Sequence, residues 1–276
     1  MSRAERTPDN ADARMPQIER RDRITELLDS MAFVRVSDLS QRFGVSEVTI
    51  RTDLETLDAE GQLRRVRGGA VSMSRVGREP SYAESLGDRA DEKAAIGAIA
   101  AALVSPGESV FLDVGTTTTA VARALVQRDD LEDIVVLTNA LPIALELEPA
   151  IPRFSVILTG GTLRPLQHSL VNPLATRLLE QLHVDTGFIG CTGVAWPNGV
   201  TNVNLPEAEI KRHIAHKAGR RILVADGSKV GAVSLAPVCA LDEIDLLITG
   251  PSASADDLEE LEAHDLAVEV AGRAGR

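Results

Sequence analysis

The chain of 276 residues is 44% hydrophobic and 25% charged, a length that favours about two domains and a composition that excludes a disordered or collagen-like protein. Its mean hydropathy of +0.01 also excludes a bundle of membrane helices. The formal net charge of −12 argues against a protein that coats nucleic acid along its whole length, and two cysteines, Cys191 and Cys239, are too few for a disulfide framework, which favours a cytoplasmic protein.

The first seventeen residues carry charges and small polar groups without an apolar run, so residues 1–17 are predicted to be a disordered tail. Apolar residues then recur three and four positions apart from Ile18 to Met31, which predicts an amphipathic helix. A short strand at 33–36 leads into a second helix, which Ser37 is expected to cap and Gly44 to end. These elements begin a small, mainly helical domain.

A third helix is predicted to begin after Ser46, whose residue type caps helix N-termini, and to end at Gly61. Two short helices around a glycine-centred turn have the spacing of a helix-turn-helix, whose second helix enters the DNA major groove. Four residues near the start of the third helix are predicted to contact DNA: Ser46, Thr49, Arg51 and Thr52. Four apolar residues of the same helix are expected to face the core: Val48, Ile50, Leu54 and Leu57.

The segment LRRVRGGAV that follows predicts two short strands joined by a tight turn at Gly68 and Gly69. Residues 1–78 hold 14 arginines, no lysine and 13 acidic residues, or +1, so the remaining 15 basic and 28 acidic residues give −13. Residues 64–78 have a local charge of +5, because they contain five arginines with no acid between them: Arg64, Arg65, Arg67, Arg75 and Arg78. We predict that Arg64, Arg65 and Arg67 contact the DNA backbone or minor groove, with a solvated basic linker as the alternative.

The segments RRDRITELL and VRVSDLSQRFGVSEVTIRTDLETLDAEGQLRRVRGGAV resemble the winged helix-turn-helix of the DeoR family of bacterial transcription regulators. The resemblance implies that residues 18–76 form a DNA-binding domain whose partner is double-stranded operator DNA. Thr52 stands where the family usually has a second arginine, and Arg67 where it often has a histidine. Because both positions are expected to face DNA, these departures bear on which operator sequence is read.

Residues 77–91 are polar, with one proline, two glycines and no sustained periodicity, and are predicted to be an interdomain linker. From 92 to 272, apolar runs of strand length alternate with helical segments, which is typical of βαβ units. After a helix at 92–104, strands are predicted at 109–114, 134–138, 154–159, 187–190, 221–225 and 246–249. The predicted fold class is an N-terminal winged helix-turn-helix followed by a doubly wound, mostly parallel α/β domain.

Polar residues follow the predicted strands, at the edge where parallel sheets bind ligands. The glycine and threonines after Asp113 can present helical amides and hydroxyls to an anion such as phosphate. In a later helix at 207–218, Glu207 is predicted to accept sugar hydroxyls and Lys211 to meet a phosphate, with a capped surface helix as the alternative. The predicted effector-binding residues are Asp113, Gly115, Thr116, Thr117, Thr118, Thr138, Asn139, Gly160, Gly161, Arg164, Glu207, Lys211 and Lys229.

Residues 79–250 also resemble the DeoR-type sensor domain, through SVFLDVGTTTTAVARAL, VLTNALPIALEL, VILTGGTLRP and ADGSKVG. The resemblance implies a fold similar to ribose-phosphate isomerases and glucosamine-phosphate deaminases. It also implies a phosphorylated sugar or related metabolite as effector, whose binding lowers operator affinity. Asn172 stands where a glycine is commoner, which bears on the shape of the pocket.

The isomerase-like fold raises a second hypothesis, an enzyme that converts a sugar phosphate. Its general base would be one of four carboxylates: Asp113, Asp185, Glu207 or Asp226. No acid partner beside them is evident in the sequence, and a DNA-binding module has no role in a simple isomerase. The enzyme is therefore the alternative, and no catalytic residue is predicted.

Metal and nucleotide cofactors are not predicted either. His213 and His216 are three apart on a helix but have no evident third ligand, and nucleotide-binding glycine motifs are absent from the sequence. Helix-turn-helix proteins usually pair on two-fold DNA sites, so a homo-oligomer, dimer or tetramer, is expected. The sequence thus predicts a cytoplasmic transcriptional repressor that a phosphorylated sugar releases from its operator.

Overall fold

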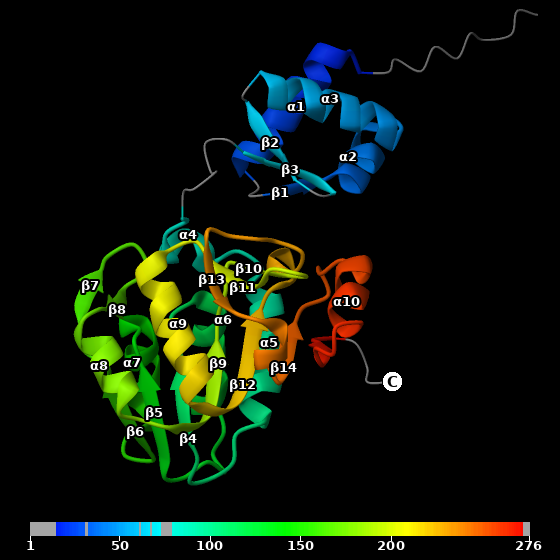
Figure 1. The fold of residues 1–276 in the computed structure, drawn as a ribbon. Helices are drawn as coiled ribbons and strands as arrows, with labels where there is room; N and C mark the ends of the chain where they lie inside the picture. Colours follow the sequence, from blue (N-terminus) through cyan, green and yellow to red (C-terminus); the bar gives the residue numbers. More distant parts are fainter. Residues whose placement is uncertain (1–14, 31–32, 61, 67, 73–78, 273–276) are drawn as a thin grey trace, which may run out of the picture. The chain divides into compact units, whose positions relative to one another are not determined.

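The structure, a computed structural model, describes residues 15–30, 33–60, 62–66, 68–72 and 79–272 (Figure 1). The chain divides into two compact units, 1–78 and 79–276, each with its own hydrophobic core. Within the described ranges, no helix is long and apolar enough to cross a membrane.

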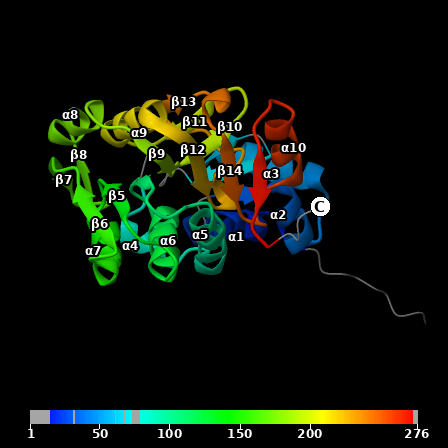
Figure 2. The same cartoon turned by 90° about the horizontal axis from the view of Figure 1, so that it is seen from below.

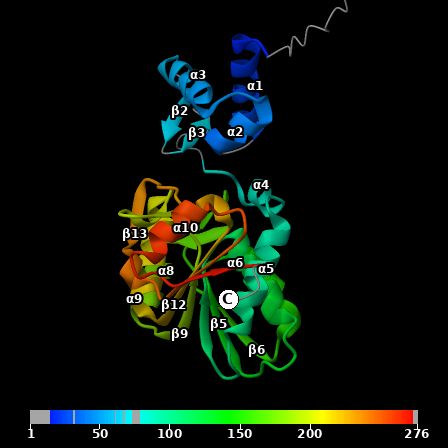
Figure 3. The same cartoon turned by 90° about the vertical axis from the view of Figure 1, so that its right-hand side faces the viewer.

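The described part of the first unit combines helices with a small antiparallel sheet (Figure 3). Its elements are α1 (Gln17–Ser30), β1 (Phe33–Arg35), α2 (Val36–Phe43), α3 (Glu47–Ala59), β2 (Leu63–Val66) and β3 (Gly69–Ser72). The strands lie in the order β1-β3-β2, and β2 and β3 form the predicted hairpin, with Gly68 at φ 81° in its turn. Gly61 and Arg67 lie outside the described residues.

The start of α2 differs from the sequence prediction. Val36, expected in the strand, is the first helical residue, and Ser37, expected as the cap, lies within the helix. Val36 and Leu39 are three positions apart and both buried, so packing of one helix face sets this boundary. Gly44 ends the helix as predicted, because its φ of 63° is a left-handed conformation that glycine adopts without strain.

The core of the first unit gathers residues from α1, α2 and α3 and from β1, β2 and β3: Ile24, Leu28, Val34, Val36, Leu39, Ile50, Leu54, Leu57, Leu63 and Ala70. Three of the four residues predicted to face inward on α3 belong to it. Val48 does not, since 68% of its surface is exposed. Because it precedes Ile50 by two residues, it lies about 200° away around the helix, so that prediction was wrong.

The second unit is built on a seven-stranded sheet in the order β15-β14-β12-β9-β4-β5-β6, with every pair parallel. Its strands are β4 (Ser109–Leu112), β5 (Ile134–Thr138), β6 (Phe154–Leu158), β9 (Val184–Ile189), β12 (Ala218–Ala225), β14 (Leu246–Thr249) and β15 (Val268–Val270). Its helices are α4 (Tyr82–Leu86), α5 (Ala90–Ala102), α6 (Thr116–Val126), α7 (Leu141–Leu147), α8 (Leu174–Glu180), α9 (Leu205–Lys217) and α10 (Ala255–Glu262).

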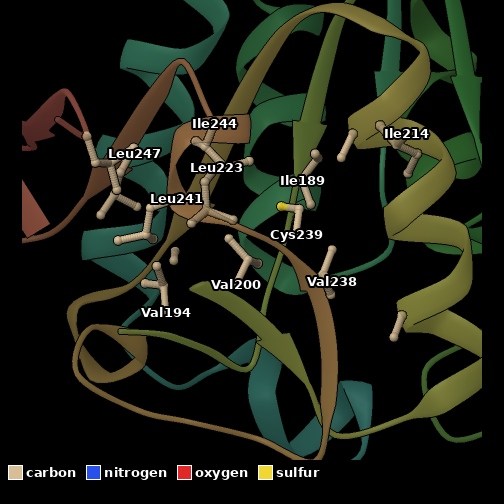
Figure 4. Packing of buried hydrophobic residues seen from close by; sticks show 14 of the residues in the cluster. Ile189, Val194, Val200, Ile214, Leu223, Val238, Cys239, Leu241, Ile244 and Leu247 are labelled. Atoms are coloured by element: carbon tan, nitrogen blue, oxygen red, sulfur yellow. The ribbon is translucent and has the colours of Figure 1, made fainter. Parts of the chain in front are cut away.

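Helices cover both faces of this sheet, so the second unit has three layers (Figure 2). Helices α5, α6 and α7 enclose one apolar core, and α8, α9 and α10 enclose the other. Figure 4 shows part of the second core, where Leu223 and Leu247 of the sheet and Ile214 of α9 lie. Alternation along β4 serves both cores, because Phe111 belongs to one and its neighbours Val110 and Leu112 to the other. The doubly wound parallel fold predicted from the sequence is confirmed.

Two smaller sheets flank the main one. The hairpin of β7 (Thr162–Arg164) and β8 (Ser169–Val171) follows β6, and β10 (Gly193–Ala195), β11 (Gly199–Asn202) and β13 (Ala236–Cys239) form an antiparallel sheet. The predicted linker of 77–91 has more structure than its composition indicated. It contains α4 and the start of α5, because Ser81 and Glu84 form a capping box and Tyr82 is buried.

Candidate functional sites

The exposed N-terminal half of α3 carries the residues predicted to contact DNA. The Ser46 side chain caps the helix by accepting a hydrogen bond from the Thr49 backbone N–H at 3.2 Å, as predicted. Arg51 is exposed and forms an ion pair with Glu47 at 2.8 Å, one helical turn away. The Thr52 hydroxyl donates to the Val48 carbonyl at 3.1 Å. These side chains line one stretch of helix that a major groove can accept.

A buried carboxylate fixes α3 against α1. Asp53 has no exposed surface, and its Oδ2 accepts a hydrogen bond from Arg20 Nε at 2.6 Å. Its Oδ1 accepts from Arg21 Nε at 3.1 Å and from Gln17 Nε2 at 3.3 Å. Both carboxylate oxygens are therefore satisfied. Sequence reasoning missed this residue, because a charged residue inside an apolar helix pattern gives no sign of its distant partners.

The β2–β3 hairpin places one arginine with a described side chain beside α3. Arg65 in β2 pairs with Glu55 of α3 at 2.7 Å, and its side chain is 37% exposed. Arg64 lies in β2 but its side chain is not described, and Arg67, Arg75 and Arg78 lie outside the described residues. The structure thus places Arg65, one of the arginines predicted to contact DNA, beside α3.

In the second unit, a fully buried aspartate stands at the carboxyl end of β4. The Oδ2 atom of Asp113 accepts hydrogen bonds from the Lys211 ammonium and from the Gly190 backbone N–H at 3.0 Å. Its Oδ1 is buried and has no hydrogen-bond partner in the structure described. A buried oxygen without a partner costs about 1–3 kcal/mol, so an unpaired donor arriving here would gain that much.

Glu207 extends this group of charges toward the β7–β8 hairpin. Its Oε1 accepts hydrogen bonds from Ser169 Oγ at 2.6 Å and from Arg164 Nη1 at 2.8 Å. Arg164 in turn binds both carboxylate oxygens of Glu79, through Nη1 at 2.9 Å and through Nη2. We call Asp113, Lys211, Glu207, Arg164 and Glu79 the charge cluster. It joins α9 to the strand β4, to the hairpin and to the chain before α4.

Burial and charge shift the pKa values in the charge cluster. Burial raises the pKa of Asp113, although the Lys211 ammonium and the Gly190 N–H oppose the shift. Burial alone would lower the pKa of Lys211, but the carboxylates of Asp113 and Glu207 outweigh it and raise that pKa. Burial also raises the pKa of the nearby Cys191 thiol to about 12, so this cysteine stays a neutral thiol. Lys211 is therefore a fixed positive charge at neutral pH.

The threonine turn after β4 begins α6. Gly115 is its N-cap, and the hydroxyls of Thr118 and Thr119 donate to the Gly115 carbonyl at 2.9 and 2.8 Å. No side chain caps this helix, so the backbone N–H groups of its first turn have no intrahelical partner. The N-terminus of α6 begins three residues after Asp113, a member of the charge cluster.

Three other predicted effector-binding residues have structural roles. The Thr138 hydroxyl accepts from the Ala140 N–H, and the Asn139 side chain accepts from the Val114 N–H, each at 3.1 Å. A Cβ on Gly161 would lie 2.1 Å from the Val171 carbonyl oxygen, so close packing of the hairpin requires glycine there. Within the described residues, no hydrogen bond or ion pair joins Lys229 to the charge cluster.

Two members of this site escaped sequence reasoning. Glu79 falls in the segment predicted as linker, and Ser169 is a lone serine in a short hairpin strand. No sequence motif marks either residue as part of this site. No cluster of three or more metal-ligating side chains occurs in the portion of the chain the structure describes.

Comparison with known protein families explains both units. The DeoR-like helix-turn-helix domain matches residues 20–76, and the DeoR C terminal sensor domain matches residues 88–251. The chain belongs to the DeoR family. It is accordingly a transcriptional regulator with a DNA-binding helix-turn-helix and a sensor domain, as the sequence resemblance implied.

Two relatives of this DeoR-family chain are named as transcriptional regulators, and a solved isomerase structure is distantly similar. The HTH-type transcriptional regulator GlpR of Haloferax volcanii is 38% identical over 250 residues, which are 91% of this chain and 96% of that protein. A putative aga operon transcriptional repressor of Escherichia coli O157:H7 is 33% identical over 256 residues, 92% of this chain and 94% of its own. Ribose 5-phosphate isomerase A of Methanocaldococcus jannaschii, 17% identical, covers 51% of this chain and 55% of its own with a TM-score of 0.38.

Proposed function

We propose that this DeoR-family regulator is a cytoplasmic homo-oligomeric repressor, which binds double-stranded operator DNA and releases it when a phosphorylated sugar occupies the sensor domain. The repressor role is supported by the name of one relative, a putative operon repressor. The oligomer is proposed because helix-turn-helix units usually read two-fold sites in pairs. No cofactor or catalytic step is part of the proposal.

The DNA-binding surface in this proposal is the exposed start of α3, with Arg65 beside it. Arg51 reads a base edge in the major groove, where guanidinium groups bind guanine through two hydrogen bonds. Ser46, Thr49 and Thr52 contribute hydroxyls, and the arginines of the hairpin contact phosphates. Because Asp53 holds α3 on α1, the reading side chains approach DNA on a rigid support.

The single observation that carries the effector proposal is the unpartnered, fully buried Oδ1 of Asp113. A sugar hydroxyl donating to this oxygen would satisfy it. The uncapped N-terminus of α6, three residues further along, offers backbone N–H groups and the Thr116 hydroxyl to the phosphate. A buried acceptor beside a helix N-terminus suits a ligand with hydroxyls at one end and an anion at the other.

Release of DNA requires that the effector bind the DNA-free state more tightly than the DNA-bound state. A tenfold loss of operator affinity corresponds to about 1.4 kcal/mol of coupling free energy. Because coupling is reciprocal, operator DNA weakens effector binding by the same factor.

The test is a melting screen of the full-length protein against sugar phosphates and their unphosphorylated counterparts, with turnover measured in parallel. A sugar phosphate at about 100 times its dissociation constant should stabilise the sensor unit by roughly 2.7 kcal/mol. The Thr116→Val variant removes one hydroxyl at the α6 N-terminus and should weaken this response. Lys217→Gln, at the far end of α9, is the control and should not.

Two results would contradict the proposal. If unphosphorylated sugars stabilise the protein equally well, phosphate recognition is refuted. If a sugar phosphate is converted with efficient turnover while operator affinity is unchanged by every compound, the protein is an isomerase-like enzyme with an accessory DNA-binding module. The carboxylates of Asp113 and Glu207 near Lys211 are the observation that favours testing this alternative.

A further inference from the structure

The first described residues after 73–78 are fastened to the β7–β8 hairpin at three successive points. Arg164, the last residue of β7, binds Glu79 through two hydrogen bonds. In the turn that follows, Gln167 Nε2 donates to the Pro80 carbonyl, and the Leu166 carbonyl accepts from the Tyr82 N–H at 2.8 Å. The chain segment 79–82 is therefore held by the hairpin that also contributes Arg164 and Ser169 to the charge cluster.

The bond between Arg164 and Glu79 has the geometry by which arginine recognises a ligand carboxylate. A guanidinium with two parallel N–H groups on one carboxylate is the two-point pairing that proteins use for free carboxylates and phosphates. The side chains of Arg164 and Glu79 are 17% and 10% exposed, so the pair lies at the rim of the cluster rather than beneath it. Glu207, which shares Arg164, is 4% exposed.

The charges of the cluster weaken the attraction that holds Glu79 on Arg164. Three carboxylates, on Asp113, Glu207 and Glu79, face the two cations Lys211 and Arg164. Burial raises the pKa of Glu79, and the neighbouring Glu207 carboxylate raises it further against the opposing effect of Arg164. If Glu79 leaves, two carboxylates face two cations, and Arg164 keeps two N–H donors for another anion.

The contacts of the cluster also indicate which groups a ligand would carry. From the α6 N-terminus the contacts run through Asp113 and Lys211, then one turn along α9 to Glu207, and end at Arg164. The proposed phosphate position and Arg164 are thus the two ends of one chain of neighbouring charged groups. A ligand that contacts both ends has a phosphate at one end and a second anion at the other.

We propose that the effector is a phosphorylated sugar acid whose carboxylate takes the place of Glu79 on Arg164, so that effector binding frees the segment 79–82 that leads to the DNA-binding unit. This inference rests on the proposed function and names the ligand class and the moving contact. Glu79 acts as an internal occupant of the carboxylate position while the effector is absent. Arg164 is the residue that distinguishes phosphorylated sugar acids from the phosphates of neutral sugars.

The experiment compares matched probes on the full-length protein by calorimetry. The probes are the phosphorylated aldonates of four, five and six carbons, each paired with the phosphorylated alditol of equal length, which has a hydroxymethyl group in place of the carboxylate. In at least one pair, the aldonate should bind the wild-type protein about tenfold more tightly, or about 1.4 kcal/mol. Hydrogen exchange at the Tyr82 amide should rise with that aldonate and not with its alditol.

Three variants locate the effect. Glu79→Gln weakens the internal competitor, so it should raise aldonate affinity severalfold and leave alditol affinity unchanged. Arg164→Gln should abolish the preference for the aldonate. Glu180→Gln, an exposed acid at the end of α8, is the matched control and should bind both probes as the wild type does.

The outcomes separate this inference from the proposed function. If sugar phosphates or alditol phosphates bind and release operator while aldonates gain nothing and Glu79→Gln changes nothing, the inference is overturned and the proposed function stands. If the aldonate preference is present but survives in Arg164→Gln, the carboxylate does not bind where we place it. If no phosphorylated probe binds the wild-type protein, both proposals are refuted.

Discussion

Among the residues that the structure describes, each unit has one aspartate with no exposed surface, and the two aspartates differ in their hydrogen bonds. Asp53 in the DNA-binding unit receives hydrogen bonds on both oxygens, from Arg20 on one and from Arg21 and Gln17 on the other. Asp113 in the sensor unit receives bonds on Oδ2 alone, and its Oδ1 is unpartnered. The saturated carboxylate of Asp53 holds two helices together, whereas we propose that the free oxygen of Asp113 accepts a hydrogen bond from a ligand.

The difference extends to the two units as wholes. In the DNA-binding unit, Arg51, Thr52 and Arg65 are exposed on the surface proposed to bind DNA, and the buried charge is structural. In the sensor unit, the groups proposed to bind the effector include the buried charges Asp113 and Glu207. Substitutions should therefore separate stability from binding in the first unit and change both together in the second.

The largest effect is expected for Asp53→Ala. Removing this carboxylate leaves the buried Arg20 without a counter-charge, which typically costs about 3–5 kcal/mol. The free energy of unfolding of the DNA-binding unit, followed by hydrogen exchange at the α3 amides, should fall by that amount. Asp22→Ala, on the exposed side of α1, is the control and should change stability by less than about 0.5 kcal/mol. An equally small loss for Asp53→Ala would show that the ion pairs are dispensable.

Asp113→Asn should lower the free energy of unfolding less than Asp53→Ala does, and it should abolish the response to the ligand. An asparagine still accepts hydrogen bonds from Lys211 and Gly190, and Glu207 remains near the ammonium, so we expect a loss of about 2 kcal/mol in the unfolding free energy. The stabilisation by sugar phosphate should disappear, as denaturation with and without the compound will show. Asp129→Asn, at an exposed position, should keep it. A loss as large as that of Asp53→Ala with an intact ligand response would remove the contrast between the two aspartates.

Arg51→Ala tests the exposed reading surface. Because a guanidinium that reads a base is worth about 1–3 kcal/mol, operator binding should weaken by that amount while binding to random duplex changes little. The thermal stability should stay unchanged, since Arg51 is exposed and, among the described residues, pairs only with Glu47. Arg177→Ala, on α8 of the sensor unit, should bind both duplexes normally. Equal losses on operator and random DNA would refute base reading by Arg51.

Arg65→Ala should have the smallest effect and the least sequence dependence. A lost phosphate contact weakens every duplex by a similar factor and reduces the slope of log affinity against log salt by up to about one. Titrations at several salt concentrations measure this slope. An unchanged slope would remove Arg65 from the DNA contact.

Much of this fold could be predicted because its elements are encoded locally. The strands at 134–138 and 246–249 were predicted with the bounds that the structure has, since each is an apolar run between turn residues. Gly44 and Ser46 were predicted as helix boundaries from their residue types alone. Family resemblance then supplied the assignment of both domains, which the comparisons confirm.

The errors and omissions arise where distant residues meet. Val48 fits an apolar pattern yet lies on the outer face of α3, because its angular position rather than its polarity decides exposure. Asp53 and Glu79 owe their roles to partners 33 and 85 positions away in the chain, and no local pattern encodes such pairs. Strands β9 and β12 begin earlier than predicted because pairing with neighbours extends them past their apolar residues.

Two of the arginines proposed to touch DNA form ion pairs with glutamates while the protein is free, Arg51 with Glu47 and Arg65 with Glu55. Each guanidinium must leave a carboxylate before it reaches the duplex. A chromosome offers on the order of a million or more competing sites, and at those sites phosphate charge is the only compensation. We expect these internal ion pairs to weaken binding to non-specific DNA. A few copies of the regulator per cell are then enough to occupy one operator.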